Sequence, residues 1–78
     1  MCMESKPIAK QFGVVVRKLR TNRGMSQEAF ADLCGVHRTY MGTIERGEKT
    51  VTIETVDKIA KALNIRVSQL FIELEKSE

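Results

Sequence analysis

The sequence predicts an all-α fold, a compact five-helix domain with a central helix-turn-helix. Apolar residues recur at the 3.6-residue spacing of helices in five stretches, and short polar or glycine-containing segments separate these stretches. The chain has only one proline and five glycines, which argues against a turn-rich all-β sandwich. With 78 residues it is long enough for one domain with a small core and too short for a two-domain enzyme.

The first predicted helix spans residues 8–22 and follows a flexible N-terminal tail of residues 1–7. Pro7 suits the start of this helix because its missing N–H needs no partner there, and Gly24 suits the left-handed turn after its end. Residues 8–78 form the single domain. The core-facing residues of this helix are Ile8, Phe12, Val15, Val16 and Leu19.

The second and third helices are predicted over residues 27–34 and 37–46. Ser26 caps the first of them, because its side chain can accept a hydrogen bond from a backbone N–H of the first turn. Gly35 allows a left-handed backbone between the helices, and Gly47 ends the second of them. Two helices joined by about three residues fit a helix-turn-helix. The residues expected to pin them together are Phe30, Ala31, Cys34, Val36, Met41 and Ile44.

The fourth helix is predicted over residues 53–63, with Thr52 as its cap and Asn64 at its end. Its apolar stripe is Ile53, Val56, Ile59, Ala60 and Leu63. Ser68 is expected to cap a fifth helix. The apolar residues of that helix, expected to face the core or a partner, are Leu70, Phe71 and Leu74.

Positive charge is concentrated at the start of the chain, although the net charge is only +3. Residues 1–23 hold six lysines and arginines against Glu4 as the one acidic residue. This distribution indicates a basic face that meets a polyanion, and a solvated charged helix is the alternative.

Several classes of function find no support in the residues. Cys2 and Cys34 form no disulfide framework. Cys34 and His37 offer two metal ligands where a structural zinc needs four, so no metal or cofactor is expected. One histidine, no glycine-rich phosphate loop and no credible pair of carboxylates argue against an enzyme. With no signal peptide or 18-residue apolar run, we expect a cytoplasmic protein with no membrane and no small-molecule partner.

The run SQEAFADLCGVHRTYMGTIERG resembles the phage-repressor-like (Xre-type) helix-turn-helix domain. Residues 53–63 and 68–70 extend the resemblance through the five-helix, lambda-repressor-like fold of that family. Within the family, RTYMGTIERG and the short chain are similar to the controller proteins of restriction–modification systems. The resemblance implies a sequence-specific DNA-binding transcriptional regulator that acts as a homodimer on a palindromic operator, with such a controller role. An antitoxin, a phage-type repressor and an interaction module that binds protein and not DNA are the alternatives.

The resemblance also implies which residues meet double-stranded DNA. The second helix of the motif enters the major groove, and its base-contacting residues here are His37, Arg38, Thr39 and Thr43. Among them Arg38 has the chemistry to read guanine through bidentate bonds to O6 and N7. The alternatives are that His37 only starts its helix and that Tyr40 packs over the first helix. The residues implied to contact phosphate are Gln27, Tyr40, Arg46, Lys49 and Thr52.

Arg20 and Glu45 match a paired position in the family, where an ion pair ties the first helix to the third. An exposed pair contributes only about 0–1 kcal/mol, so we expect it to position the recognition helix rather than to stabilise the fold. Two independent surface charges are the alternative. Gly42 departs from the small polar residue that is usual in the family, and a mid-helix glycine costs about 1 kcal/mol relative to alanine. Close approach of DNA or of another helix would explain it, and so would neutral drift.

A homodimer is expected because one such domain covers too few base pairs for specificity without a second half-site. The residues expected at its interface are Ile65, Val67, Phe71, Ile72 and Leu74. Ile72 lies on the side of the fifth helix opposite Leu70 and Leu74, which indicates a contact outside the domain's own core. A single exposed apolar residue is the alternative.

Overall fold

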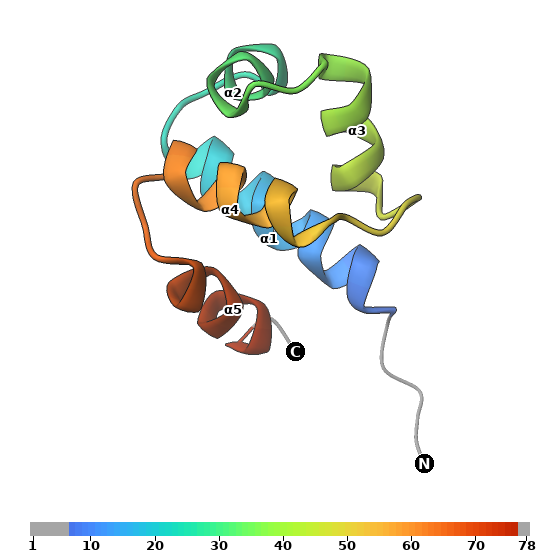
Figure 1. The fold of residues 1–78 in the computed structure, drawn as a ribbon, viewed down its shortest axis with the longest axis vertical. Helices are drawn as coiled ribbons and strands as arrows, with labels where there is room; N and C mark the ends of the chain where they lie inside the picture. Colours follow the sequence, from blue (N-terminus) through green and yellow to red (C-terminus); the bar gives the residue numbers. More distant parts are fainter. Residues whose placement is uncertain (1–6, 77–78) are drawn as a thin grey trace.

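The computed structural model describes residues 7–76, and over that range the chain is all-α (Figure 1). The five helices are α1 (Ile8–Asn22), α2 (Gln27–Cys34), α3 (Arg38–Arg46), α4 (Ile53–Ala62) and α5 (Val67–Lys76). The predicted five-helix fold is thus confirmed. Residues 1–6 of the predicted tail, and residues 77–78, lie outside the described residues.

The helices enclose one hydrophobic core to which all five contribute. α2 and α3 lie at one end of the molecule and α5 at the other, with α1 and α4 between them (Figure 1). α1 packs against α3 and α5, while α4 packs against α2 and α5. The buried apolar side chains are Phe12, Val15, Val16, Phe30, Ala31, Cys34, Met41, Ile44, Val56, Ile59, Ala60, Leu63, Leu70 and Leu74. Burial among them raises the pKa of the Cys34 thiol to about 11.

Side-chain caps begin α2, α3 and α4. The hydroxyl of Ser26 accepts a hydrogen bond from the Ala29 N–H at 3.0 Å, and that of Thr52 accepts one from Thr55 at 3.1 Å. Such caps satisfy backbone donors that have no partner within the helix. Both caps had been expected from the sequence.

The connection between α2 and α3 depends on a left-handed residue. Gly35 has φ +78°, which any residue with a Cβ adopts only at a cost, and its N–H reaches back to the carbonyl of Asp32. Asn64 makes a similar turn after α4, with φ +59°. Asparagine tolerates this conformation better than other non-glycine residues, so Asn64 can make the turn that was expected of it. The helix itself ends at Ala62, one residue before the predicted end, and Leu63 is its C-terminal cap.

Three predictions about helix starts differ from the structure. The third helix begins at Arg38 and not at residue 37, because His37 is its cap. Pro7 is the cap of α1 rather than its first helical residue, because its ψ of 142° is extended. Ser68 does not cap α5, because that helix already begins at Val67 and Ser68 lies in its first turn. Ser68 is exposed, while Val67 before it and Leu70 after it face the core, so the apolar spacing of the helix already begins at Val67.

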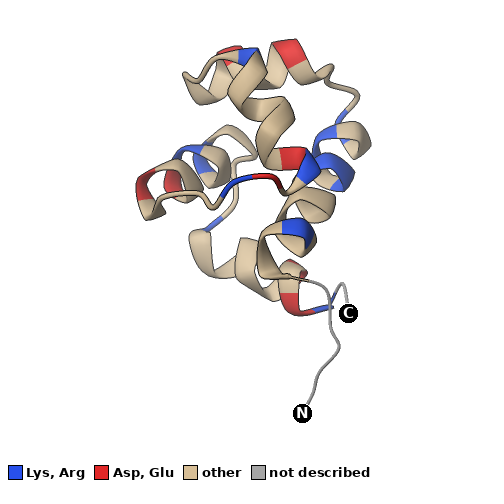
Figure 2. Cartoon of the chain, turned by 90° about the vertical axis from the view of Figure 1, so that its right-hand side faces the viewer, with Lys and Arg blue, Asp and Glu red and all other residues tan. Residues whose placement is uncertain are grey.

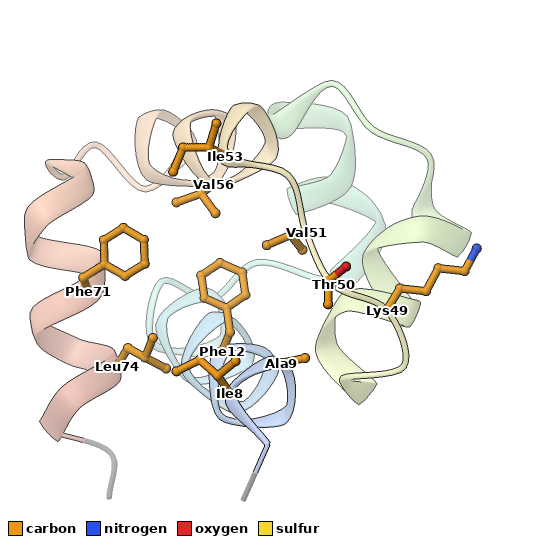
Figure 3. A pocket seen from close by; sticks show the side chains of 10 residues that line it. All are labelled: Ile8, Ala9, Phe12, Lys49, Thr50, Val51, Ile53, Val56, Phe71 and Leu74. Carbon is orange, nitrogen blue, oxygen red and sulfur yellow. The ribbon is translucent and has the colours of Figure 1, made fainter.

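Ile8 and Ile53 were expected in the core, but they are 63% and 69% exposed. Each is the first residue of its helix, at the rim of the domain, where no neighbouring helix covers it. With Phe71 they line an apolar groove of about 320 Å³ between α1, α4 and α5 (Figure 3). The apolar spacing in the sequence therefore extends to the first residue of each helix, although the contacts between helices do not reach that far.

The backbones of α1 and α3 approach closely at Gly13, a glycine for which the apolar pattern predicted no role. A Cβ at Gly13 would stand 2.5 Å from the carbonyl oxygens of both Ile44 and Glu45. A Cβ at Gly47 would likewise stand 2.6 Å from the Cα of Lys10. The signal that could have found Gly13 is a glycine inside an apolar helical period, which often marks a packing requirement.

Candidate nucleic-acid interface

α3 presents two unlike faces, and this fixes which of its side chains can meet a ligand. Met41 and Ile44 are 0% and 1% exposed and anchor the helix in the core. Arg38 and Thr39 are exposed and Thr43 is half-buried, away from that anchor. Three of the four residues implied to contact bases therefore lie on the free face of one helix.

The hydroxyl of Thr43 is engaged within α3. It donates a hydrogen bond to the carbonyl of Thr39 at 3.0 Å, one turn earlier. Its methyl group and its remaining lone pairs are what it can offer to a ligand.

His37 caps α3. Its Nδ1 accepts a hydrogen bond from the backbone N–H of Thr39 at 3.1 Å, and its backbone is extended with ψ 145°. This bond defines the neutral tautomer with hydrogen on Nε2, which leaves Nε2–H as the outward donor. His37 therefore has a structural role in addition to its predicted contact with DNA.

Glu45 is the centre of a polar network that joins three helices. Arg20 of α1 donates to both of its carboxylate oxygens, from Nε to Oε2 at 2.7 Å and from Nη2 to Oε1 at 3.0 Å. Gln27 of α2 donates from Nε2 to Oε1 at 3.0 Å. Arg20 also donates from Nη1 to the carbonyl of Met25 at 2.8 Å. The predicted pair exists, and nothing in the sequence pattern predicted the contributions of Gln27 and Met25.

The Arg20–Glu45 pair is buried, contrary to the expectation of an exposed pair. The two side chains are 10% and 4% exposed. The hydrogen bond from Arg20 to Glu45 raises the pKa of the guanidinium, although burial opposes the rise. Loss of one partner would leave a charge without its counterion in a protected site, so the pair contributes to stability as well as to position.

Gln27 lies beside Gly42 as well as Glu45. A Cβ at Gly42 would stand 3.4 Å from Gln27 Oε1 and 3.1 Å from Arg46 Nη1. The missing side chain at position 42 thus leaves room for these two side chains over α3. Gln27 uses one amide N–H on Glu45, and its second N–H is the one that can serve the predicted phosphate contact.

The other residues implied to contact phosphate lie in different settings. Arg46 donates from Nε to Glu48 Oε2 at 2.9 Å, and this bond raises the pKa of Arg46 and lowers that of Glu48. Lys49 is exposed. Thr52 is exposed at the start of α4, and its hydroxyl is part of the cap. Tyr40 is half-buried against the core, which agrees in part with its alternative role in packing.

Acidic residues interrupt the basic surface that the charge distribution suggested. Figure 2 looks from the side of α3 and shows Lys and Arg positions interspersed with Asp and Glu positions. The Nη1 of Arg38 stands 3.7 Å from Oε2 of Glu28, a residue of α2, and both side chains are well exposed. Arg38 and Arg46, two of the basic residues implied to meet DNA, therefore each have a carboxylate neighbour.

The residues predicted at a dimer interface do not all lie on the surface. Phe71 and Ile72 are 39% and 44% exposed, whereas Leu74 is buried in the core of its own chain. Ile65 and Val67 are half-buried against that core. Phe71 and Ile72 therefore offer the largest apolar surface of this set to a second copy.

Among residues 7–76 no group of three or more His, Cys, Asp and Glu side chains is arranged to hold a metal ion. None of the helices in this part of the chain has the length and apolar character needed to cross a membrane.

Comparison with known proteins connects this geometry to a family. A family model described as helix-turn-helix matches residues 16–70, from the middle of α1 into α5. The control protein C.SmaI of Serratia marcescens is 47% identical over 55 residues, which are 70% of this chain and 66% of that protein. The control protein C.BamHI of Bacillus amyloliquefaciens is 43% identical over 60 residues, 76% of this chain and 74% of that protein.

A solved structure agrees in both fold and sequence. The crystal structure of the restriction-modification controller protein C.AhdI from Aeromonas hydrophila superposes with a TM-score of 0.78 at 43% identity. The match covers 81% of this chain and 96% of that chain.

Proposed function

The chain belongs to the helix-turn-helix family of Xre type, and from that premise we propose that it is a sequence-specific DNA-binding regulator of transcription. It acts as a homodimer on a palindromic operator and serves as the controller protein of a restriction–modification system. Arg38, Thr39, Thr43 and His37 read bases, while Gln27, Arg46, Lys49, Thr52 and Tyr40 hold the backbone.

The free face of α3 is the observation that carries the proposal. Arg38 and Thr39 stand at the N-terminal end of a helix whose opposite face is fixed in the core by Met41 and Ile44. Family members insert this end of the helix into the major groove. The network at Glu45 supports the role, because its hydrogen bonds link α3 to α1 and α2.

The length of α3 supports a dimer on two half-sites. The helix has nine residues, so its exposed face can span only a few base pairs. Two copies on half-sites about one helical turn apart double the number of bases that are read.

The controller role is supported by the names of the relatives, which are control proteins and a restriction-modification controller protein. The genes beside this one test it directly. A methyltransferase gene and an endonuclease gene are expected there, and a toxin gene in their place would favour an antitoxin instead.

DNA binding is tested with purified protein and a pool of random DNA duplexes. We expect the wild type to select one palindromic sequence. Arg38→Ala should lose about 1–3 kcal/mol per half-site on that operator and relax the preference at one base pair. Lys49→Ala should weaken binding to operator and random DNA alike, and should lower the salt slope by about 1 per half-site.

Two outcomes would contradict the proposal. Failure to enrich any sequence would leave an interaction module that does not bind DNA specifically. An equal loss for Arg38→Ala on operator and on random DNA would assign Arg38 to phosphate, and base reading would then rest on other residues or on DNA shape.

A further inference from the structure

We propose that Glu28 is a specificity-determining residue, which holds Arg38 for guanine and keeps it from phosphate. The inference rests on the proposed function and deepens it. Glu28 lies in the first turn of α2, outside the helix that is expected to enter the groove, and it is not among the residues predicted to contact DNA.

The pair leaves the reading edge of Arg38 open. Glu28 Oε2 stands 3.7 Å from Nη1 of Arg38, which is one corner of the guanidinium. A guanidinium carries five N–H donors in a planar fork, and its Nε and Nη2 together can serve the two acceptors of a guanine edge. A carboxylate at the Nη1 corner is therefore compatible with bidentate guanine contact and restricts the orientations that Arg38 adopts.

The same carboxylate opposes contact between Arg38 and phosphate. A phosphate oxygen that approached Arg38 from the Nη1 side would also approach the negative charge of Glu28. Both side chains are about two thirds exposed, 66% for Arg38 and 68% for Glu28, so water and salt weaken this repulsion without removing it. Gln27, the neighbour of Glu28 in α2, is proposed to hold a phosphate, which brings the DNA backbone near this carboxylate.

The two effects act in the same direction on specificity. On the operator, Arg38 meets neutral acceptors of a base, and Glu28 costs little. On random DNA, Arg38 has no matching guanine, and the negative charge of Glu28 disfavours contact between Arg38 and a DNA phosphate. Glu28 thus lowers non-specific affinity more than operator affinity.

The test compares Glu28→Gln with Asp32→Asn. Asp32 is exposed and lies one turn further along α2. Asp32→Asn removes the same charge as Glu28→Gln, so it measures the general effect of removing one negative charge near DNA. Binding is measured on the selected operator and on random duplexes at several salt concentrations. We expect Glu28→Gln to reduce the ratio of operator to random affinity by about fivefold per half-site, and Asp32→Asn to leave the ratio unchanged.

A second arm separates action through Arg38 from a general charge effect. In an Arg38→Ala background Glu28→Gln should no longer change the ratio, because the residue that it restrains is absent. Equal ratios for Glu28→Gln and Asp32→Asn would overturn the inference, and so would a change that persists without Arg38. If the wild type selects no operator, that result contradicts the proposed function itself, and it is distinguishable because it is obtained before any variant is compared.

Discussion

Gly13 is required because α1 and α3 leave no room for a side chain between them. In Gly13→Ala the new Cβ meets two backbone carbonyl oxygens at 2.5 Å, and backbone cannot move aside as a flexible side chain can. We expect a loss of about 1–3 kcal/mol in the free energy of unfolding, despite the better helix propensity of alanine. Urea unfolding followed by circular dichroism at one fixed protein concentration measures it.

Gly42→Ala is the matched control, because it makes the same chemical change inside a helix. Its Cβ would meet only the ends of the Arg46 and Gln27 side chains, at 3.1 and 3.4 Å. The helix-propensity gain of about 0.5–1 kcal/mol should then prevail, and the variant should be at least as stable as the wild type. Equal effects of the two substitutions would show that the contact of α1 with α3 does not require glycine.

The buried Cys34 thiol should make the free energy of unfolding fall at alkaline pH. Burial raises its pKa from 9.0 to about 11, so the folded protein holds the thiol proton more tightly than the unfolded chain does. The corresponding stability is complete below pH 9 and is lost as pH rises toward 11. The full loss, complete only above pH 11, is about 3 kcal/mol for a shift of about two pKa units, and about 2 kcal/mol of it is reached by pH 11.

Cys34→Ala isolates this contribution, because the two proteins share every other titratable group. The free energy of unfolding is measured from pH 8 to pH 11, and the difference between wild type and variant should shrink as pH rises. Parallel curves would mean that the thiol ionises equally in the folded and unfolded chain.

At the scale of single residues, the sequence predicted what depends on local chemistry. Ser26 and Thr52 were identified as caps from side-chain type and position, and Gly35 from its place after a helical period. Gly13 was missed because its requirement comes from Ile44 and Glu45, in a helix that is distant along the chain. The spacing of apolar residues within one helix does not show which other helix will pack closely against it.

Between elements, the Glu45 network predicts strong coupling of α1 to α3. Glu45→Ala leaves the Arg20 guanidinium, whose side chain is 10% exposed, without its carboxylate. We expect a loss of about 3 kcal/mol in unfolding free energy, since an uncompensated protected charge is costly. Arg20→Ala should cost a similar amount, and the double variant much less than the sum of the two.

The exposed pair of Asp57 and Lys61 on α4 supplies the comparison. Its nitrogen and oxygen are 3.1 Å apart, but the side chains are 47% and 77% exposed. Asp57→Ala should therefore change stability by less than about 1 kcal/mol. A double-mutant cycle without coupling between Arg20 and Glu45 would contradict the structural role of the network.

The existence of the elements was predictable from periodicity, but their ends were less so. The apolar period placed all five helices, since each needs a buried stripe. The same period predicted that Ile8 and Ile53 lie in the core, but both are exposed in the structure. The burial of the ion pair was not predictable, because it depends on how closely α1, α2 and α3 pack around it.

For the whole molecule, the predicted dimer should depend on the exposed side of α5. Ile72→Asp, alone or with Phe71→Asp, places a charge where we expect apolar contact between two copies. Sedimentation should show monomers at micromolar concentration, and operator binding should weaken because two half-sites are no longer linked.

Leu33→Asp controls for the loss of an exposed apolar residue. Leu33 is 59% exposed on α2, at the other end of the molecule from α5, and should leave the dimer intact. If the double variant at positions 71 and 72 stays dimeric, the interface lies elsewhere, and Ile8 and Ile53, the exposed apolar residues that line the groove from α1 and α4, become the next positions to test.

The overall fold and the exposed face of α3 followed from the sequence, whereas the place of one residue predicted at the dimer interface did not. The order of the caps and the glycine turn identified the helix-turn-helix, and α3 has the expected free face. Of the proposed dimer residues, Leu74 proved to serve the core, because apolar character alone does not distinguish a residue facing its own domain from one facing a partner.

The two faces of α3 separate folding from recognition within nine residues. Met41 and Ile44 hold the domain together, while the side chains at positions 38, 39 and 43 contribute nothing to the buried core. These three positions are among those proposed to read bases, so we expect substitution there to change the preferred DNA sequence without loss of the scaffold. A duplicated gene can diverge there until its product controls promoters that the original ignores, so that two such regulators work independently in one cell.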